Sequence, residues 1–144
     1  MKTITVKWGD DAQTYLVWTF DRDWKPEQFY EVFDAGMQMQ CAQPHVVDHV
    51  FDLSNVFSLN GSIIPMARYT LYHPQRLRHT AILILPSKHM IRMLEIVKRV
   101  LPGDWQEQVV RVSTMRDAQQ VLKTLRAERL RASEATRQAT PQSS

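Results

Sequence analysis

The sequence is poor in cysteine and glycine, the two residue types on which many recognisable small-protein sites depend. It has one cysteine, Cys41, in 144 residues, which excludes an intramolecular disulfide and a cysteine-rich zinc module. Its four glycines are scattered, whereas a loop that cradles phosphate needs clustered glycines so that backbone N–H groups can approach the anion. We therefore expect neither Walker-type nor Rossmann-type nucleotide binding, and no cofactor.

Long apolar segments are also missing. The longest apolar run, residues 81–86, is far shorter than the roughly 20 residues that span a bilayer. Residues 1–8 alternate polar and apolar side chains and do not form the apolar centre of a signal peptide. Together with the single cysteine, which suits a reducing compartment, these features predict a cytoplasmic protein without stable membrane insertion.

The composition and length favour one globular domain. Hydrophobic residues make up 44% of the chain and charged residues 23%, close to the average for such domains. Apolar periodicity weakens after residue 125, so we expect a single domain over residues 1–125, followed by the end of the last helix and a disordered basic tail over 126–144. This tail holds four Arg and two Glu, a net charge of +2, which leaves +1 for the domain. The net charge of +3 therefore does not indicate that the domain binds nucleic acid.

Hydrophobic periodicity predicts an α/β fold with elements in the order ββαβαβαβα. The short link between the first two strands predicts an antiparallel hairpin. Three strand–helix–strand units follow, and such units require mainly parallel pairing, so the five-stranded sheet should be mixed and mostly parallel. We expect strands near residues 4–8, 13–20, 46–53, 80–85 and 108–113, and helices near 26–39, 62–72 and 88–101 and from 115 onward.

Metal-ligating and catalytic side chains form no recognisable site. Cys41, His45 and His49 are close in sequence, but Pro44 interrupts the run and His49 is expected on a strand, so we predict a loop histidine, a packed histidine and no metal site. No serine lies in a Gly-x-Ser-x-Gly elbow, which disfavours a serine hydrolase. The candidate nucleophiles are Ser58, Ser62, Ser87 and Ser113.

The basic segment 73–79 has no interleaved aromatic residues on which nucleic-acid bases could stack, so it is predicted to be a solvated loop.

The segment 52–69, DLSNVFSLNGSIIPMARY, resembles the signature of STAS domains, the anti-sigma-factor antagonist fold. That family carries a strand ending in Asp-Leu-Ser-x-Val, followed by an Asp-Ser-Ser-Gly-Leu segment that opens the next helix. The order of elements agrees with the family over residues 2–125, and residues 111–118 resemble its closing strand and helix start. The N-terminal hairpin is similar to that of a divergent, stand-alone bacterial group within this family.

The resemblance implies that Ser62 corresponds to the phosphorylated serine of the family. Asn60 and Gly61 stand where the family has Asp and Ser, and Ile63 stands where it has Gly. The signature is therefore degenerate, and a plain helix cap at Ser62 is the alternative. By this resemblance we expect a non-enzymatic regulatory or adaptor domain that binds a protein partner. The expected contact residues are Asn60, Gly61, Met66, Arg68 and Tyr69.

The methionines and aromatic residues support a second hypothesis, a carrier or sensor of an apolar, lipid-like small molecule. Methionine fills irregular apolar space, so a group of methionines can line a pocket or simply complete the core. An enzyme of unrecognised type is the third hypothesis. The oligomeric state stays open, with a homodimer among the alternatives. The methionines in question are Met37, Met39, Met90 and Met93.

Overall fold

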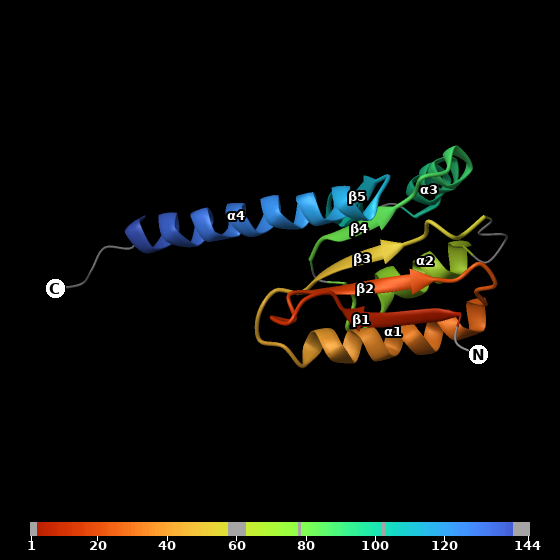
Figure 1. Cartoon of the computed structure of the whole chain (residues 1–144), viewed down its shortest axis with the longest axis horizontal. Coiled ribbons are helices and arrows are strands. Elements are labelled where there is room, and N and C mark those ends of the chain that lie inside the picture. The colour runs from red at the N-terminus through yellow and green to blue at the C-terminus, as the bar shows by residue number, and fades with distance from the viewer. Residues whose placement is uncertain (1–2, 58–62, 78, 102, 140–144) are drawn as a thin grey trace.

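The computed structural model describes residues 3–57, 63–77, 79–101 and 103–139 and has the predicted order of elements (Figure 1). The strands are β1 (Ile4–Trp8), β2 (Tyr15–Phe20), β3 (Asp48–Asp52), β4 (Ala81–Ile84) and β5 (Val109–Val112). The helices are α1 (Pro26–Cys41), α2 (Ile63–Tyr72), α3 (Lys88–Val100) and α4 (Met115–Ala139). A short 3₁₀ helix, η2 (Asp104–Gln108), was not predicted.

The five strands form one mixed sheet in the order β1-β2-β3-β4-β5. β1 pairs antiparallel with β2, and every other pairing is parallel, which confirms the predicted fold class. Each strand lies beside its predecessor in the chain. The sheet therefore has no topological switch point, the place where open α/β sheets usually form their ligand crevice.

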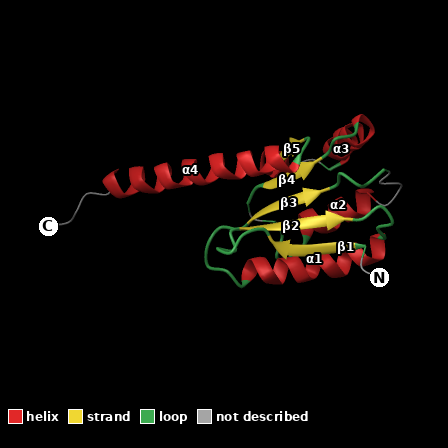
Figure 2. Ribbon diagram, in the orientation of Figure 1, coloured by secondary structure: helices red, strands yellow, loops and turns green. Residues whose placement is uncertain are grey.

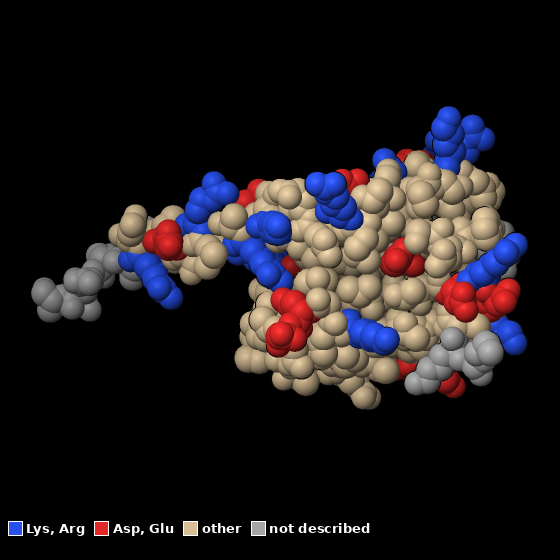
Figure 3. All heavy atoms as spheres, viewed as in Figure 1, with Lys and Arg blue, Asp and Glu red and all other residues tan. Residues whose placement is uncertain are grey.

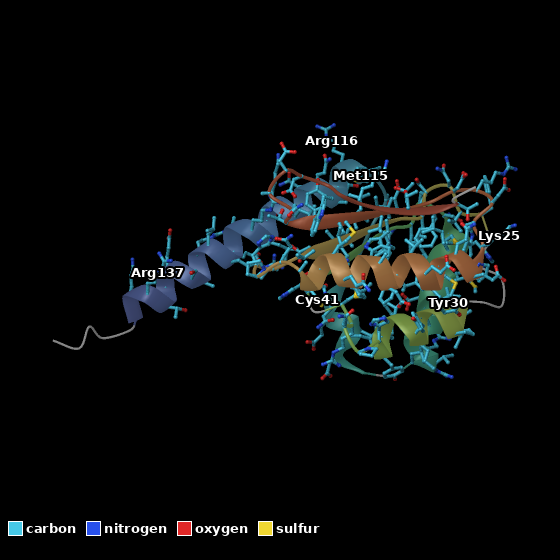
Figure 4. The ribbon with its side chains drawn as sticks, turned by 90° about the horizontal axis from the view of Figure 1, so that it is seen from below. Lys25, Tyr30, Cys41, Met115, Arg116 and Arg137 are labelled. Atoms are coloured by element: carbon cyan, nitrogen blue, oxygen red, sulfur yellow. The ribbon has the colours of Figure 1, made fainter. Side chains whose placement is uncertain are left out.

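The helices cover the sheet unequally (Figure 2). The larger core packs α1, α2 and α3 against one face, through Trp18, Phe33 and Phe51 among others. A smaller core packs α4 against the opposite face, through Ala118 and Leu122. Figure 4 shows Met115 and Arg116, at the start of α4, on the opposite side of the sheet from α1 and α2. Because β4 is covered on both faces, its side chains are apolar at every position, as its sequence predicts.

Helix α4 corrects the predicted boundary of the ordered chain. It continues to Ala139 and projects past the sheet, so most of 126–144, for which the sequence predicts the end of the last helix and then a disordered tail, is helical. Residues 140–144 lie outside the described residues. Along α4, acidic side chains are interspersed among a larger number of basic ones (Figure 3).

Two arginines attach the middle of α4 to the domain. One binds the first residue of β3, and the other binds the turn between β1 and β2. Arg129 binds Asp48 through two N–H···O bonds of 2.7 and 2.8 Å, and this hydrogen bonding raises the pKa of the arginine. Arg126 lies 2.8 Å from the Asp10 carboxylate. Burial favours a higher pKa for Asp10, but hydrogen bonds from Thr14 and Arg126 outweigh it and hold this pKa below its ordinary value. Part of the apparent basic tail is thus paired with acids of the domain.

Removal of the Arg129 side chain should destabilise the fold more than removal of a neighbouring arginine. The carboxylate of Asp48 is only 3% exposed, so Arg129→Ala leaves a buried charge unpaired and should lower the free energy of unfolding by about 2–3 kcal/mol. Arg131, which bonds only a carbonyl of its own helix, is the control, and Arg131→Ala should cost less than about 0.5 kcal/mol. Urea denaturation measures both, and equal losses would contradict a structural role for the Asp48 ion pair.

Candidate functional site

The helix that carries the predicted contact residues, α2, has a hollow on each side. Residues 65, 68, 69 and 72 recur at helical spacing and line a groove on the outside of the molecule. Residues 63, 66, 67, 70 and 71 form the opposite stripe and line a cavity between α2 and the sheet. One short helix therefore lies between two hollows, the outer groove and a cavity against the sheet.

The outer groove has a volume of about 440 Å³ and an aromatic lining. Tyr30 of α1 and Tyr69 of α2 meet edge to face with ring centroids 4.9 Å apart, and Tyr30 lies on the side of α1 that faces α2 in Figure 4. Tyr72 is 65% exposed at the end of the helix, and Arg68 is exposed beside it. The remaining lining residues are Pro65, His73 and Pro74.

A hydrogen-bonded group fixes the floor of this groove. The Tyr69 hydroxyl donates to Asp34 at 2.6 Å, and His73 Nε2 lies 2.8 Å from the same carboxylate oxygen. Because His73 Nδ1 accepts the backbone N–H of Gln75, the neutral ring carries its proton on Nε2 and donates it to Asp34. The hydrogen bonds from Tyr69 and His73 lower the pKa of Asp34, and the carboxylate in turn raises the pKa of Tyr69. Both nitrogens of His73 thus make structural hydrogen bonds.

The inner hollow is an apolar cavity of about 170 Å³, which we call the apolar chamber. Its walls come from the inner face of the sheet, from α2 and from α3, and Thr70 is the only residue among them without an apolar or aromatic side chain. A cavity of this kind offers a ligand burial of apolar surface but almost no hydrogen bonds. The sixteen lining residues include Phe20, Phe51, Met66, Leu83, Leu94 and Trp105.

A second cavity of about 490 Å³, with both polar and apolar residues in its lining, adjoins the chamber, and we call it the mouth. The two share six lining residues, among them Leu77 and Trp105. The indole N–H of Trp105 donates to the Leu101 carbonyl at 2.6 Å, which fixes the ring between the two spaces. Gly103, just before η2, has φ of +143°, a conformation that favours glycine. The polar residues of the mouth are Thr70, Arg76, His79, Asp104 and Gln108.

A buried hydrogen-bond chain positions the loop that carries Arg76. The Trp18 indole N–H donates to His49 Nδ1 at 3.1 Å, so the neutral imidazole donates from Nε2 to the Gln40 side-chain oxygen at 2.7 Å. The Gln40 amide then donates to the carbonyls of Gln75 and Arg76. Burial, and to a lesser extent His79, lowers the pKa of His49 to about 3. The loop that carries Arg76 is therefore held by a hydrogen-bond network in which His49 must be neutral.

Two of the predicted contact residues line the outer groove, and a third lines the apolar chamber. Arg68 and Tyr69 line the groove as part of one helical stripe. Met66 is 7% exposed and lines the apolar chamber, which corrects its predicted position on a contact face. Asn60, Gly61 and Ser62, together with the candidate nucleophile Ser58, lie outside the described residues.

The other candidate residues lie apart from this site. His45 is exposed and donates to the Gln13 carbonyl, Cys41 is exposed, and His49 is packed in the core, as predicted for the two histidines. No group of three metal-ligating side chains occurs within the described ranges. Ser87 and Ser113 have no hydrogen bond to a histidine or carboxylate among those residues.

Of the two alternatives for the four methionines, the structure shows core packing and not a pocket lining. None of the four methionines lines the apolar chamber or the mouth: Met37 and Met90 are fully buried in the core, and Met39 and Met93 pack against it. The chamber leaves no local pattern in the sequence because its walls come from strands and helices that are distant in the chain. The 3₁₀ helix η2 was not predicted because the segment 104–108 is too short to show helical periodicity.

Acid should destabilise the fold through His49. In the unfolded chain this side chain has its ordinary pKa of 6.5, and in the folded chain about 3. Stability from the neutral form is therefore complete above pH 6.5 and is lost as the pH falls toward 3. Relative to His49→Gln, which can accept from Trp18 and donate to Gln40, the wild type should lose about 1.4 kcal/mol per pH unit between about pH 6 and pH 4. Denaturation at several pH values measures this difference, and parallel curves would contradict it.

Known proteins provide no match from which a function could be transferred to this chain. No protein-family model matches the chain, and no curated protein matches it. Within the described residues, no helix combines the length and apolarity that crossing a bilayer demands.

Proposed function

We propose that this chain is a non-enzymatic regulatory or adaptor domain that binds a protein partner through the groove on the outer face of α2. The observation that carries the proposal is the stripe of Pro65, Arg68, Tyr69 and Tyr72, which begins within the segment 52–69 that resembles the STAS signature. The α/β fold is compatible with that resemblance, and the family acts through protein contacts.

The chemistry of the groove suits a protein surface. Tyrosine and arginine are enriched at the centres of protein interfaces because they bury a large area and also form hydrogen bonds. The ring of Tyr69 is already fixed by Asp34 and Tyr30, so binding requires little further ordering of this side chain. Tyr72 and Arg68 are exposed and supply the area that a partner would cover.

Phosphorylation of Ser62 is the proposed means of regulation. Ser62 immediately precedes α2 in the sequence, and a phosphate there adds about −1.5 to −2 charges. A helix N-terminus tolerates negative charge, so the domain would stay folded. An acidic partner surface that is attracted to Arg68 would be repelled by the phosphate.

A second candidate function, the binding of an apolar small molecule, is favoured by the apolar chamber. Engineered cavities of about 150 Å³ lined by apolar side chains stay dry and bind benzene. The chamber, at about 170 Å³, is of similar size and has a similar lining. This supports a ligand with one compact apolar group and disfavours a long acyl chain.

The groove can be tested by partner capture with two matched variants. Tyr72→Ala removes an exposed aromatic ring from the groove, and Leu130→Ala removes a side chain of equal exposure, 66%, from α4. Tyrosine is enriched among interface hot spots, whose removal weakens binding by about 2 kcal/mol or more, which is more than tenfold. We expect the partner that wild type captures from a lysate of the source cells, once identified, to bind Tyr72→Ala at least about tenfold more weakly. Equal affinity of wild type and Tyr72→Ala would contradict the proposal.

The regulatory part can be tested separately with the same partner. Ser62→Asp introduces a negative charge that partly mimics phosphate and should weaken binding several-fold, whereas Ser62→Ala should leave the affinity unchanged. The melting temperatures of both variants show whether the fold is intact. Unchanged binding by Ser62→Asp, with Tyr72→Ala impaired, would reject the switch and retain the groove.

A further inference from the structure

The mouth of the apolar chamber carries one cationic and one anionic side chain, and neither has an ionic partner among the described residues. Arg76 lies in the loop after α2, and Asp104 begins η2, next to Trp105 in the sequence. Both are exposed. By contrast, Arg129 and Asp48 are paired with each other. The mouth thus offers two opposite charges beside an apolar space.

These charges discriminate among ligands by the sign of their polar groups. A simple carboxylate is attracted by Arg76 and repelled by Asp104, and a simple ammonium group has the reverse balance. A zwitterion can place its carboxylate at Arg76 and its ammonium group at Asp104, so both interactions are favourable. Each exposed pair contributes only a few-fold in affinity, and the remainder must come from apolar burial.

The chamber limits the apolar group. Its volume of about 170 Å³ accommodates one branched aliphatic or one phenyl group. The shared residues Leu77 and Trp105 line both spaces, so a short molecule can bury its apolar group in the chamber and leave its polar end in the mouth. Thr70 and Gln108 supply hydrogen-bonding groups at that polar end.

We propose that the chain binds a small zwitterion with an apolar substituent, of the chemical class of the α-amino acids leucine and phenylalanine. The side chain occupies the apolar chamber, the carboxylate pairs with Arg76, and the ammonium group pairs with Asp104. The inference deepens the second function proposed above, on which it rests.

Calorimetric titration of the full chain with five compounds tests the proposal. Phenylalanine presents all three groups, glycine has no apolar group, 3-phenylpropanoate has no ammonium group, 2-phenylethylamine has no carboxylate, and toluene has neither charge. We expect phenylalanine to bind most tightly, each singly charged analogue to bind about three- to fivefold more weakly, and glycine to give no detectable binding. Leucine should behave as phenylalanine does.

Two variants assign the charges. Asp104→Asn should abolish the preference for phenylalanine over 3-phenylpropanoate, and Arg76→Gln should abolish the preference for phenylalanine over 2-phenylethylamine. Arg116→Gln, an exposed arginine at the start of α4 on the other face of the sheet, is the control and should change neither preference. Because each variant is read as a ratio of two affinities, a general loss of stability does not imitate the effect.

The titrations distinguish failure of the zwitterion proposal from failure of apolar small-molecule binding, the function on which it rests. Binding of toluene without a preference for phenylalanine over its singly charged analogues, in wild type or in the variants, would overturn the zwitterion and leave the apolar site standing. A lack of heat with every compound, leucine included, would overturn both. Preferences that persist in Asp104→Asn and Arg76→Gln would reject these two residues as the charged contacts.

Discussion

The buried indole of Trp18 is the constraint from which most of the site follows. Its ring stacks on Phe33 and Phe51, with centroids 5.6 and 5.1 Å away, and a Cβ on Gly36 would lie 2.2 Å from it, so α1 can approach β2 only through a glycine. Its N–H needs an acceptor in the core, because an unpaired buried donor is costly. His49 meets that need only when neutral, and through Gln40 the same chain of hydrogen bonds holds the loop that carries Arg76.

Helix α2 is the least buried of the helices that pack on this core, and this is why both candidate functions lie along it. Met66 is its single buried residue, whereas α1 buries five and α3 three. An apolar helix with hollows on both sides packs less closely against its neighbours than the interior of a protein usually does. Such incomplete packing lowers stability and leaves apolar surface on which another molecule can bind.

The fold could be predicted from the sequence, and the site only in part, because the two depend on different ranges of interaction. Strand alternation and the stripe of α1 are local patterns, so the order of elements and the mixed sheet could be derived from them. The groove stripe was partly predicted because Arg68 and Tyr69 lie within a local motif. The Arg129–Asp48 pair joins residues 81 apart, and the chamber joins walls from eight elements, so neither leaves a local signal. A disordered tail is predicted within 126–144 because apolar periodicity weakens there, and the acids that bind Arg126 and Arg129 lie far away in the sequence, at Asp10 and Asp48.

The groove and the mouth share one side chain, which links the two proposed functions physically. Tyr72 ends α2 and lines both spaces. A small molecule in the mouth contacts the ring that a protein partner in the groove must cover, so each ligand alters the position or freedom of a group that the other binds. Whatever the sign of that effect, linkage makes it reciprocal: a small molecule that strengthens partner binding must itself be bound more tightly in the complex. If both proposed functions hold, the domain is a receptor for two ligands on one helix, and adaptor and carrier are not mutually exclusive descriptions.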